Sequence, residues 1–309
     1  MKFSVGLWIT IVLWWTAASA TAQAPPRLQS PESRMNGPDQ PVRPQVPTLQ
    51  QRAAPEQQPA APFRLTPQED EQVDRILRVW EQRSTAVRTF DCSFKRWEYR
   101  YEMNSGQAVA PRETLGIVRY AAPDKGMFQV QQAVQDGKLV AIDPRDAEHW
   151  VCDGKSIFEF NHATKQLTEF RLPPELHGKA IADGPLPFLF GAQAEKIKQR
   201  YYIRTVPSEA EGQQTWLKAF PRYQQDAANF EHAELILTNQ NMTPFALKLY
   251  LPNGKDCVSY QFYEIVINDP LRLLKGDPFH VSTPLGWQKI VKEPATAQAS
   301  RVPPVGARR

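Results

Sequence analysis

The sequence has few of the residues that build metal sites and catalytic dyads. Its 309 residues include three cysteines and five histidines, and the histidines (149, 162, 177, 232 and 280) show neither an HExxH pair nor helical ligand spacing. The chain also lacks a GxSxG nucleophile elbow, a glycine-rich phosphate loop and an SxxK motif. We therefore expect no catalytic residue, no metal and no cofactor, although a triad assembled from distant residues would leave no local motif.

The three cysteines are Cys92, Cys152 and Cys257. An odd number leaves at least one unpaired within a monomer, and the wide spacing excludes the short knuckles that bind zinc. One disulfide is an alternative, but the interpretation as three small buried hydrophobic side chains is favoured.

The charge is also modest. The chain has 37 basic and 33 acidic residues, or +4, and removing Lys2 with the expected signal leaves 36 against 33, or +3. Neither sign forms a long block, whereas a nucleic-acid-binding surface needs a concentrated basic face. We expect no nucleic-acid partner.

The first twenty residues are typical of a secretory signal. Lys2 precedes an apolar run from Phe3 to Trp15, and Ala18-Ser19-Ala20 is a small-residue cleavage pattern. The run is shorter than the ~20 residues that a membrane-spanning helix needs, so a retained anchor is the less favoured alternative. We expect an exported protein of the periplasm or cell envelope, soluble after cleavage near Ala20.

Composition divides the rest of the chain into three parts. Residues 21–62 contain ten prolines and many glutamines, so they cannot bury enough apolar surface to offset chain entropy and are predicted to be a disordered linker. Residues 292–309 are predicted to be a disordered basic tail. Residues 63–291 remain as one domain, long enough to bury a substantial core.

This domain opens with a predicted amphipathic helix. In "LTPQEDEQVDRILRVWEQRS", Thr66 can cap the helix, Pro67 suits its first position and Glu69 completes a capping box. An apolar stripe comes next at helical spacing, formed by Val73, Ile76, Leu77 and Trp80.

Most of the domain after this helix has the period-two pattern of strands, in about eleven runs. Phe90, Cys92 and Phe94 share one face, but Trp97, Tyr99 and Tyr101 have the opposite parity, which predicts a bulge or two covered faces near Lys95 and Arg96. Asp153-Gly154 and Asn253-Gly254 are hairpin signals. The sequence therefore predicts a mainly β fold, with one curled antiparallel sheet and helices packed on it.

The order of several motifs resembles a known superfamily. They are, in chain order, "VRTFDCSF", "LGIVRYAAPDKGMFQV", "VCDGKSIFEFNHATKQLTEF", "GPLPFLFGAQ", "WLKAFP" and "DPFHVSTPLGWQKI". Together they resemble the LolA/LolB-like periplasmic lipoprotein carriers, and most closely an exported planctomycete domain family related to them. The resemblance implies an unclosed half-barrel with short lid helices on its concave face and a cavity for acyl chains. The carriers have an arginine before the strand-turn proline, but this chain has Ala122 there, so the resemblance does not extend to their release mechanism.

The leading functional hypothesis is a non-enzymatic, monomeric protein that binds a lipid or an acylated, lipoprotein-like ligand, in keeping with transport across the periplasm. One alternative is an envelope interaction or stress-sensor module with a filled cavity and a membrane-protein partner. Another is an exported enzyme acting on envelope polymers. Strand parity and the apolar stretch "IADGPLPFLFG" suggest the cavity and lid residues, for which core packing is the alternative role: Phe94, Ile117, Phe128, Phe158, Phe188, Leu189, Phe190 and Leu247.

Overall fold

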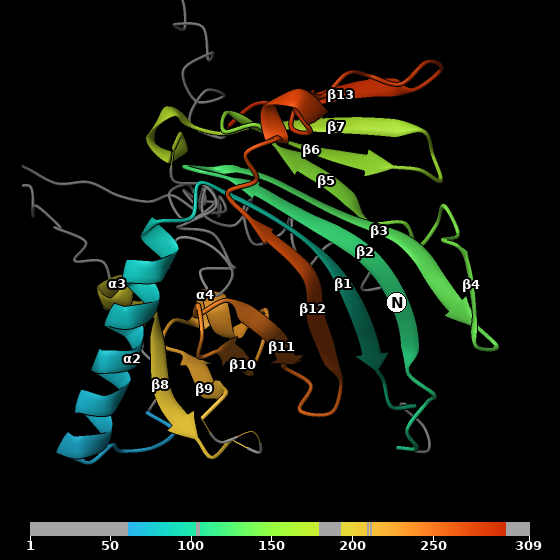
Figure 1. Cartoon of the computed structure of the whole chain (residues 1–309). Helices are drawn as coiled ribbons and strands as arrows, with labels where there is room; N and C mark the ends of the chain where they lie inside the picture. The colour runs from blue at the N-terminus through green and yellow to red at the C-terminus, as the bar shows by residue number, and fades with distance from the viewer. Residues whose placement is uncertain (1–60, 103–105, 179–192, 209, 211, 295–309) are drawn as a thin grey trace, which may run out of the picture.

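The computed structural model describes residues 61–102, 106–178, 193–208, 210 and 212–294. These residues form one sheet of thirteen strands that curls round without closing (Figure 1). The order from edge to edge is β13-β7-β6-β5-β3-β2-β1-β12-β11-β10-β9-β8, and β4 pairs with β3 beside this path. The prediction of a mainly β, unclosed half-barrel is confirmed.

The strands alternate with short turns along most of the chain. Those of the first half are β1 (Thr89–Tyr99), β2 (Arg112–Ala121), β3 (Lys125–Gln135), β4 (Lys138–Ala141), β5 (His149–Cys152), β6 (Ser156–Asn161) and β7 (Gln166–Arg171). Those of the second half are β8 (Tyr201–Val206), β9 (Gln214–Pro221), β10 (His232–Thr238), β11 (Pro244–Tyr250), β12 (Cys257–Ile267) and β13 (Gln288–Lys292). The sequence did not predict β4 or β13, and β13 pairs with β7 in parallel, so the sheet is mixed rather than purely antiparallel.

The described helices are α2 (Pro67–Thr85), α3 (Ala194–Arg200) and α4 (Gln224–Ala227), with 3₁₀ turns η2 (Pro174–Leu176) and η3 (Arg272–Lys275). The predicted capping box of α2 is present, because the Glu69 amide donates to Thr66 Oγ1 and the Thr66 amide donates to Glu69 Oε2. Val73, Leu77 and Trp80 are buried, so the predicted stripe is the packed face. Helix α2 lies against β8 and α3 at one edge of the sheet (Figure 1).

Two predicted hairpin turns have the expected chemistry. Asp153 accepts the amides of Lys155 and Ser156 between β5 and β6, and Gly154 takes a φ of +93°. Asn253 plays the same role between β11 and β12, beside Gly254 at +69°. Both glycines sit in the left-handed region that other residues rarely adopt.

The main core fills the inner face of the curled sheet. It joins buried side chains from β1–β3 and β8–β12 to those of α2 and α3, among them Phe94, Phe128, Ile197 and Leu247. The predicted placing of helices on the concave face is confirmed for α2 and α3.

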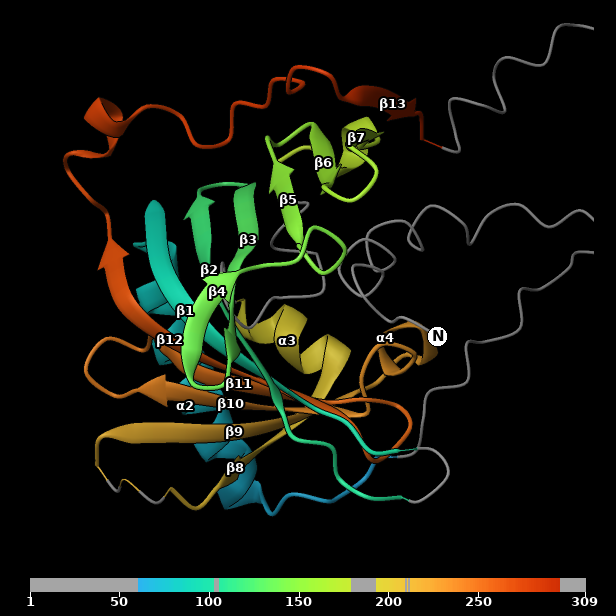
Figure 2. The same ribbon diagram turned by 90° about the vertical axis from the view of Figure 1, so that its right-hand side faces the viewer.

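The opposite, outer face carries a smaller core of Met127, Val151, Phe158, Leu167 and Phe279. Phe279 belongs to the segment between β12 and β13, which crosses the top of Figure 2 in orange and red. One end of the sheet is therefore covered on both faces.

Strand β1 differs from the prediction in one respect. Its burial alternates without interruption, so Arg96 and Glu98 continue the inner face begun by Phe90 and Phe94, and the register with β2 is unbroken at Lys95. The bulge predicted near Lys95 and Arg96 is wrong; the irregularity in the pairing with β12 falls between Asp91 and Ser93 instead. The inner face of β1 changes from apolar to charged, and Trp97 lies on the outer face.

Candidate functional site

Stacked aromatic rings line the middle of the inner face. The Phe94 and Phe128 rings stack with centroids 4.8 Å apart, and Tyr260 meets Phe94 edge-on at 5.8 Å. The chain makes room for Phe94 with Gly116 on β2, where an added Cβ would lie 2.1 Å from the Gln129 carbonyl oxygen and 2.5 Å from the Phe94 ring. Only glycine lets the ring press against the backbone of β2.

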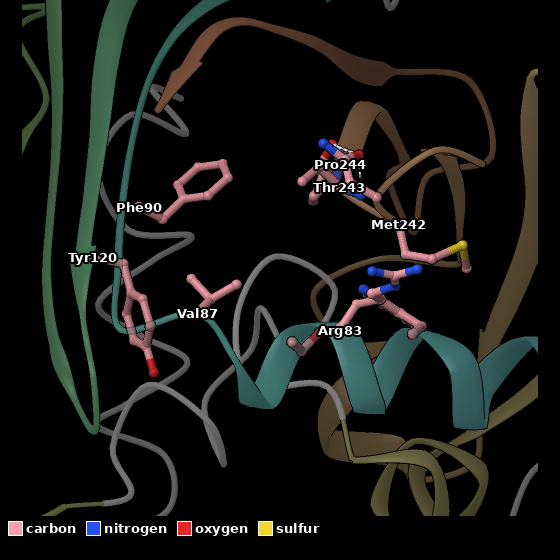
Figure 3. Close-up of a pocket in the computed structure, with 10 residues that line it drawn as sticks. Arg83, Val87, Phe90, Tyr120, Met242, Thr243 and Pro244 are labelled. Carbon is pink, nitrogen blue, oxygen red and sulfur yellow. Dashed lines mark hydrogen bonds between the residues drawn. The ribbon is translucent and has the colours of Figure 1, made fainter. Parts of the chain in front are cut away.

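A pocket lies at the end of α2, where the helix meets the sheet (Figure 3). Its walls come from the last turns of α2, the start of β1, the end of β2 and the turn between β10 and β11, and its lining residues are Trp80, Arg83, Ser84, Val87, Phe90, Tyr120, Asn241, Met242, Thr243 and Pro244. In Figure 3, Val87 and Phe90 face Thr243 and Pro244 across the space. Its volume of about 20 Å³ suits roughly one water molecule.

The described lining of this pocket is mostly apolar, with three neutral polar residues, Ser84, Asn241 and Thr243. Trp80, Phe90 and Tyr120 are buried, and Arg83 is exposed on α2. The Tyr120 hydroxyl donates to the Pro123 carbonyl at 3.3 Å, and burial raises the pKa of Tyr120. Among the described lining residues Arg83 alone is charged and no acid is paired with a base, so this lining suits an apolar ligand better than proton transfer.

A charged cluster lies on the same inner face, further along β1. Arg96 is 3% exposed and contacts Glu148 at 2.9 Å and Glu98 at 3.0 Å, while its Nε donates to Thr114 Oγ1 at 3.1 Å. Burial works to lower the pKa of Arg96, but the Glu148 and Glu98 carboxylates outweigh it and raise that pKa above the ordinary value. Arg100 supplies a second cation to Glu98 at 2.7 Å. The cluster was not predicted; the inner parity of Arg96 and Glu98 was the available signal.

Three of the predicted site residues share the inner core. Phe94, Phe128 and Leu247 are at most 2% exposed and belong to one cluster. Two others, Ile117 and Phe158, lie on the outer face, where both pack with Met127 and Val151. The structure therefore does not bring the predicted set together on one surface. Whether any of these residues contacts a ligand remains a prediction.

The remaining predicted residues, Phe188, Leu189 and Phe190, lie outside the described residues. The pocket lining includes Phe90 and Tyr120, which strand parity could have indicated. Val87 and Met242 follow no periodic pattern, so sequence reasoning had no signal for them.

The cysteines are all buried and free, which confirms the favoured interpretation. Burial raises the pKa of Cys152 to about 12, so its thiol is not a nucleophile near neutral pH. Within the described ranges, no group of three or more His, Cys, Asp or Glu side chains could hold a metal ion. No helix in this part of the chain is long and apolar enough to cross a membrane.

Two histidines serve as aromatic rings on the outer face. His149 stacks on Phe160 with centroids 4.1 Å apart, and burial, together with nearby His162, lowers its pKa to about 4. His232 stacks on Tyr250 at 4.0 Å, and burial lowers its pKa as well. A base with so low a pKa as that of His149 is poorly matched to catalysis near neutrality.

No family model and no curated protein matches the chain. Among solved structures, an uncharacterized conserved protein from Thermus thermophilus is similar at 15% identity and a TM-score of 0.39, over 72% of this chain and 99% of that one. A LolA superfamily protein from Nitrosomonas europaea is similar at 8% identity and 0.31, over 67% and 99%. The Pseudomonas aeruginosa MucA/MucB complex is similar at 15% identity and 0.35, over 69% and 64%. The superfamily indicated by the motifs is thus present among the similar structures, but likenesses this weak do not bear on ligand or activity.

Proposed function

We propose that the protein binds a lipid or an acylated, lipoprotein-like ligand on the inner face of the half-barrel, without catalysis. The observation that supports this is the pocket between α2, the start of β1 and the β10–β11 turn, because its buried lining residues Trp80, Phe90, Tyr120 and Met242 belong to the same core cluster as Phe94, Phe128 and Leu247. The signal-like N-terminus supports a place in the periplasm or cell envelope.

The pocket is too small for a whole acyl chain, so a ligand has to displace part of the core. Burying a chain of about twelve carbons contributes about 9 kcal/mol, at about 0.8 kcal/mol per methylene. Lifting the α2 stripe costs about 1.5–3 kcal/mol for each of its three buried side chains, or about 5–9 kcal/mol. A long chain offsets this cost, whereas a chain of about four carbons, worth about 3 kcal/mol, does not. Affinity should therefore rise steeply with chain length.

The test is displacement of a fluorescent fatty acid by unlabelled fatty acids of increasing length, with native mass spectrometry of the purified protein to detect lipid that co-purifies. Val87→Trp, which fills the pocket, should abolish binding. Gln82→Trp, on an exposed position of the same helix outside the pocket, should leave it unchanged. The proposal is wrong if no lipid co-purifies and no fatty acid of any length displaces the fluorescent fatty acid.

A second candidate is an interaction or sensor module in which the chain itself fills the inner face. The stacks of Phe94 on Phe128 and of Phe128 on Trp150, with centroids 4.8 and 6.1 Å apart, together with the buried Ile197 of α3, favour it. If this candidate is correct, a native pull-down should recover a membrane-spanning partner. The amount recovered should be the same for Val87→Trp and should not depend on lipid. Recovery of no membrane protein would count against it.

A further inference from the structure

Strand β13 is attached to the sheet mainly through its backbone. It pairs in parallel with β7 from Gln288↔Gln166 to Lys292↔Phe170, at one edge of the sheet (Figure 1). Of its five side chains only that of Ile290 is half-buried, and the other four are exposed. A short parallel edge strand with so little side-chain burial is among the least stable parts of a sheet.

The two lysines of β13 make electrostatic contacts, one on each face of β7. Lys289 Nζ lies 2.7 Å from Glu169 Oε2 on the outer face, over the Phe158 ring at 5.8 Å. Lys292 Nζ lies over the Phe170 ring at 4.7 Å, on the other face. Burial raises the pKa of Glu159 on β6, and the positive charge of Lys292 acts to lower that pKa. The edge thus offers the Glu169 carboxylate on one face and the Phe170 ring on the other, and β13 brings one lysine to each.

A long connection joins β13 to the rest of the sheet. Residues 268–287 separate it from β12, and they are anchored in the outer core by the buried Phe279 and the partly buried Val281 and Trp287. The partners are remote in sequence, since Gln166 and Gln288, whose side chains hydrogen-bond, are 122 residues apart. Strand β13 is therefore not joined to β7 by a hairpin turn. It is a segment from a distant part of the chain, tethered to the sheet by a long connection.

We propose that the edge of β7 is a binding site for an extended polypeptide segment carrying two lysines three residues apart, and that β13 is its internal competitor. The partner is a protein with such a segment, which adds as a parallel strand and places one lysine on each face of β7. Backbone pairing supplies the attachment, and the Glu169 carboxylate and the Phe170 ring supply the preference for lysine. A tethered strand acts at an effective concentration of millimolar order, so the partner binds weakly until β13 is released.

The test uses a fluorescent peptide of residues 286–294, GWQKIVKEP, and the full chain. Ile290→Pro removes the backbone N–H of residue 290 and fixes its φ angle, so β13 no longer pairs stably with the edge. This variant should bind the peptide at least about tenfold more tightly than the unaltered protein. Ile290→Thr, which keeps the amide and suits a strand, is the matched control and should bind like the unaltered protein. A peptide with both lysines replaced by glutamate should lose at least about tenfold in affinity for Ile290→Pro.

The proposal is overturned if Ile290→Pro and the unaltered protein bind the peptide with equal affinity. It is also overturned if Ile290→Pro binds the glutamate peptide as tightly as the lysine peptide. Hydrogen exchange on the unaltered protein gives a second measurement that needs no variant. With saturating peptide, the amides of residues 288–292 should exchange faster while those of β7 stay protected. Unchanged exchange in β13 at saturation also overturns it.

Discussion

Replacing Trp80 with alanine should both destabilise the protein and enlarge its pocket. Trp80 is 2% exposed, is the largest fully buried side chain of the described residues, and lines the pocket. Truncating a buried tryptophan costs about 3–5 kcal/mol, because apolar contacts are lost and a cavity remains. Since this cavity joins an existing apolar pocket, an alkyl ligand can fill it.

Part of that loss should return when a ligand is added. A ligand present at about 100 times its dissociation constant stabilises the folded state by about 2.7 kcal/mol. Urea unfolding of Trp80→Ala, followed by circular dichroism with and without dodecanol below its micelle concentration, measures both quantities. Dodecanol should recover about half or more of the lost free energy of unfolding.

Leu167→Ala is the control for this experiment. Leu167 is 1% exposed in the outer core, and its truncation costs about 2–5 kcal/mol, but it lies neither on the α2 stripe nor in the pocket lining. Dodecanol should therefore stabilise this variant no more than it stabilises the unaltered protein. Equal rescue of both variants would show that the alcohol acts on the protein in general, and a loss below about 1 kcal/mol for Trp80→Ala would refute the packing argument itself.

Three further predictions concern stability. Gly116→Ala should cost about 1–3 kcal/mol in urea unfolding, because its Cβ would lie 2.5 Å from the Phe94 ring, and an unchanged midpoint would contradict this. Arg96→Met should cost about 3–5 kcal/mol, since it leaves buried Glu148 without its cation and Glu98 with Arg100 alone, whereas Arg145→Met, with a side chain 68% exposed, should change stability by at most about 0.5 kcal/mol. His149 has a folded-state pKa of about 4, below the 6.5 of an unfolded histidine, so the unfolded state binds the proton first and stability falls as the pH drops from about 6.5 to about 4. The whole effect is about 3 kcal/mol, and His149→Phe, which keeps the ring, should flatten this part of the stability curve.

Sequence reasoning succeeded where structure is set by neighbours along the chain. The capping box of Thr66 and Glu69 and the stripe that ends at Trp80 lie within one helix. The turns at Asp153 and Asn253 use their own side chains to hold the following amides. Such features need no knowledge of distant partners.

It failed where a distant segment decides the environment. Strand β13 has no alternation to detect, because four of its five side chains are exposed and its partner is β7. The aromatic residues of opposite parity from Trp97 onwards suggested a bulge or two covered faces, but there is no bulge, and Arg96 stays inside because Glu148, 52 residues away, neutralises it.

The same limit explains the mixed outcome for the site residues. Strand β2 is apolar on both parities because both of its faces are covered, by the inner core beside Val118 and by the outer core beside Ile117. Parity alone cannot say which face is concave when both are apolar. Gly116 adds to the ambiguity, since it leaves an inner position without a side chain.

The two edges of the sheet are protected in different ways, and this separates the two proposed binding events. At β8 the cover is α2, with nineteen residues and three buried side chains, so its release requires an apolar ligand of comparable burial. At β7 the cover is β13, with five residues and one half-buried side chain, so backbone pairing by another segment is enough to replace it. An acyl ligand should therefore act at α2 and an extended peptide at β7. Ile290→Pro should leave the chain-length dependence of lipid binding unchanged, and Val87→Trp should leave peptide binding unchanged. A variant at one edge that altered binding at the other would show that the half-barrel opens as a unit, with α2 and β13 coupled through the sheet between them.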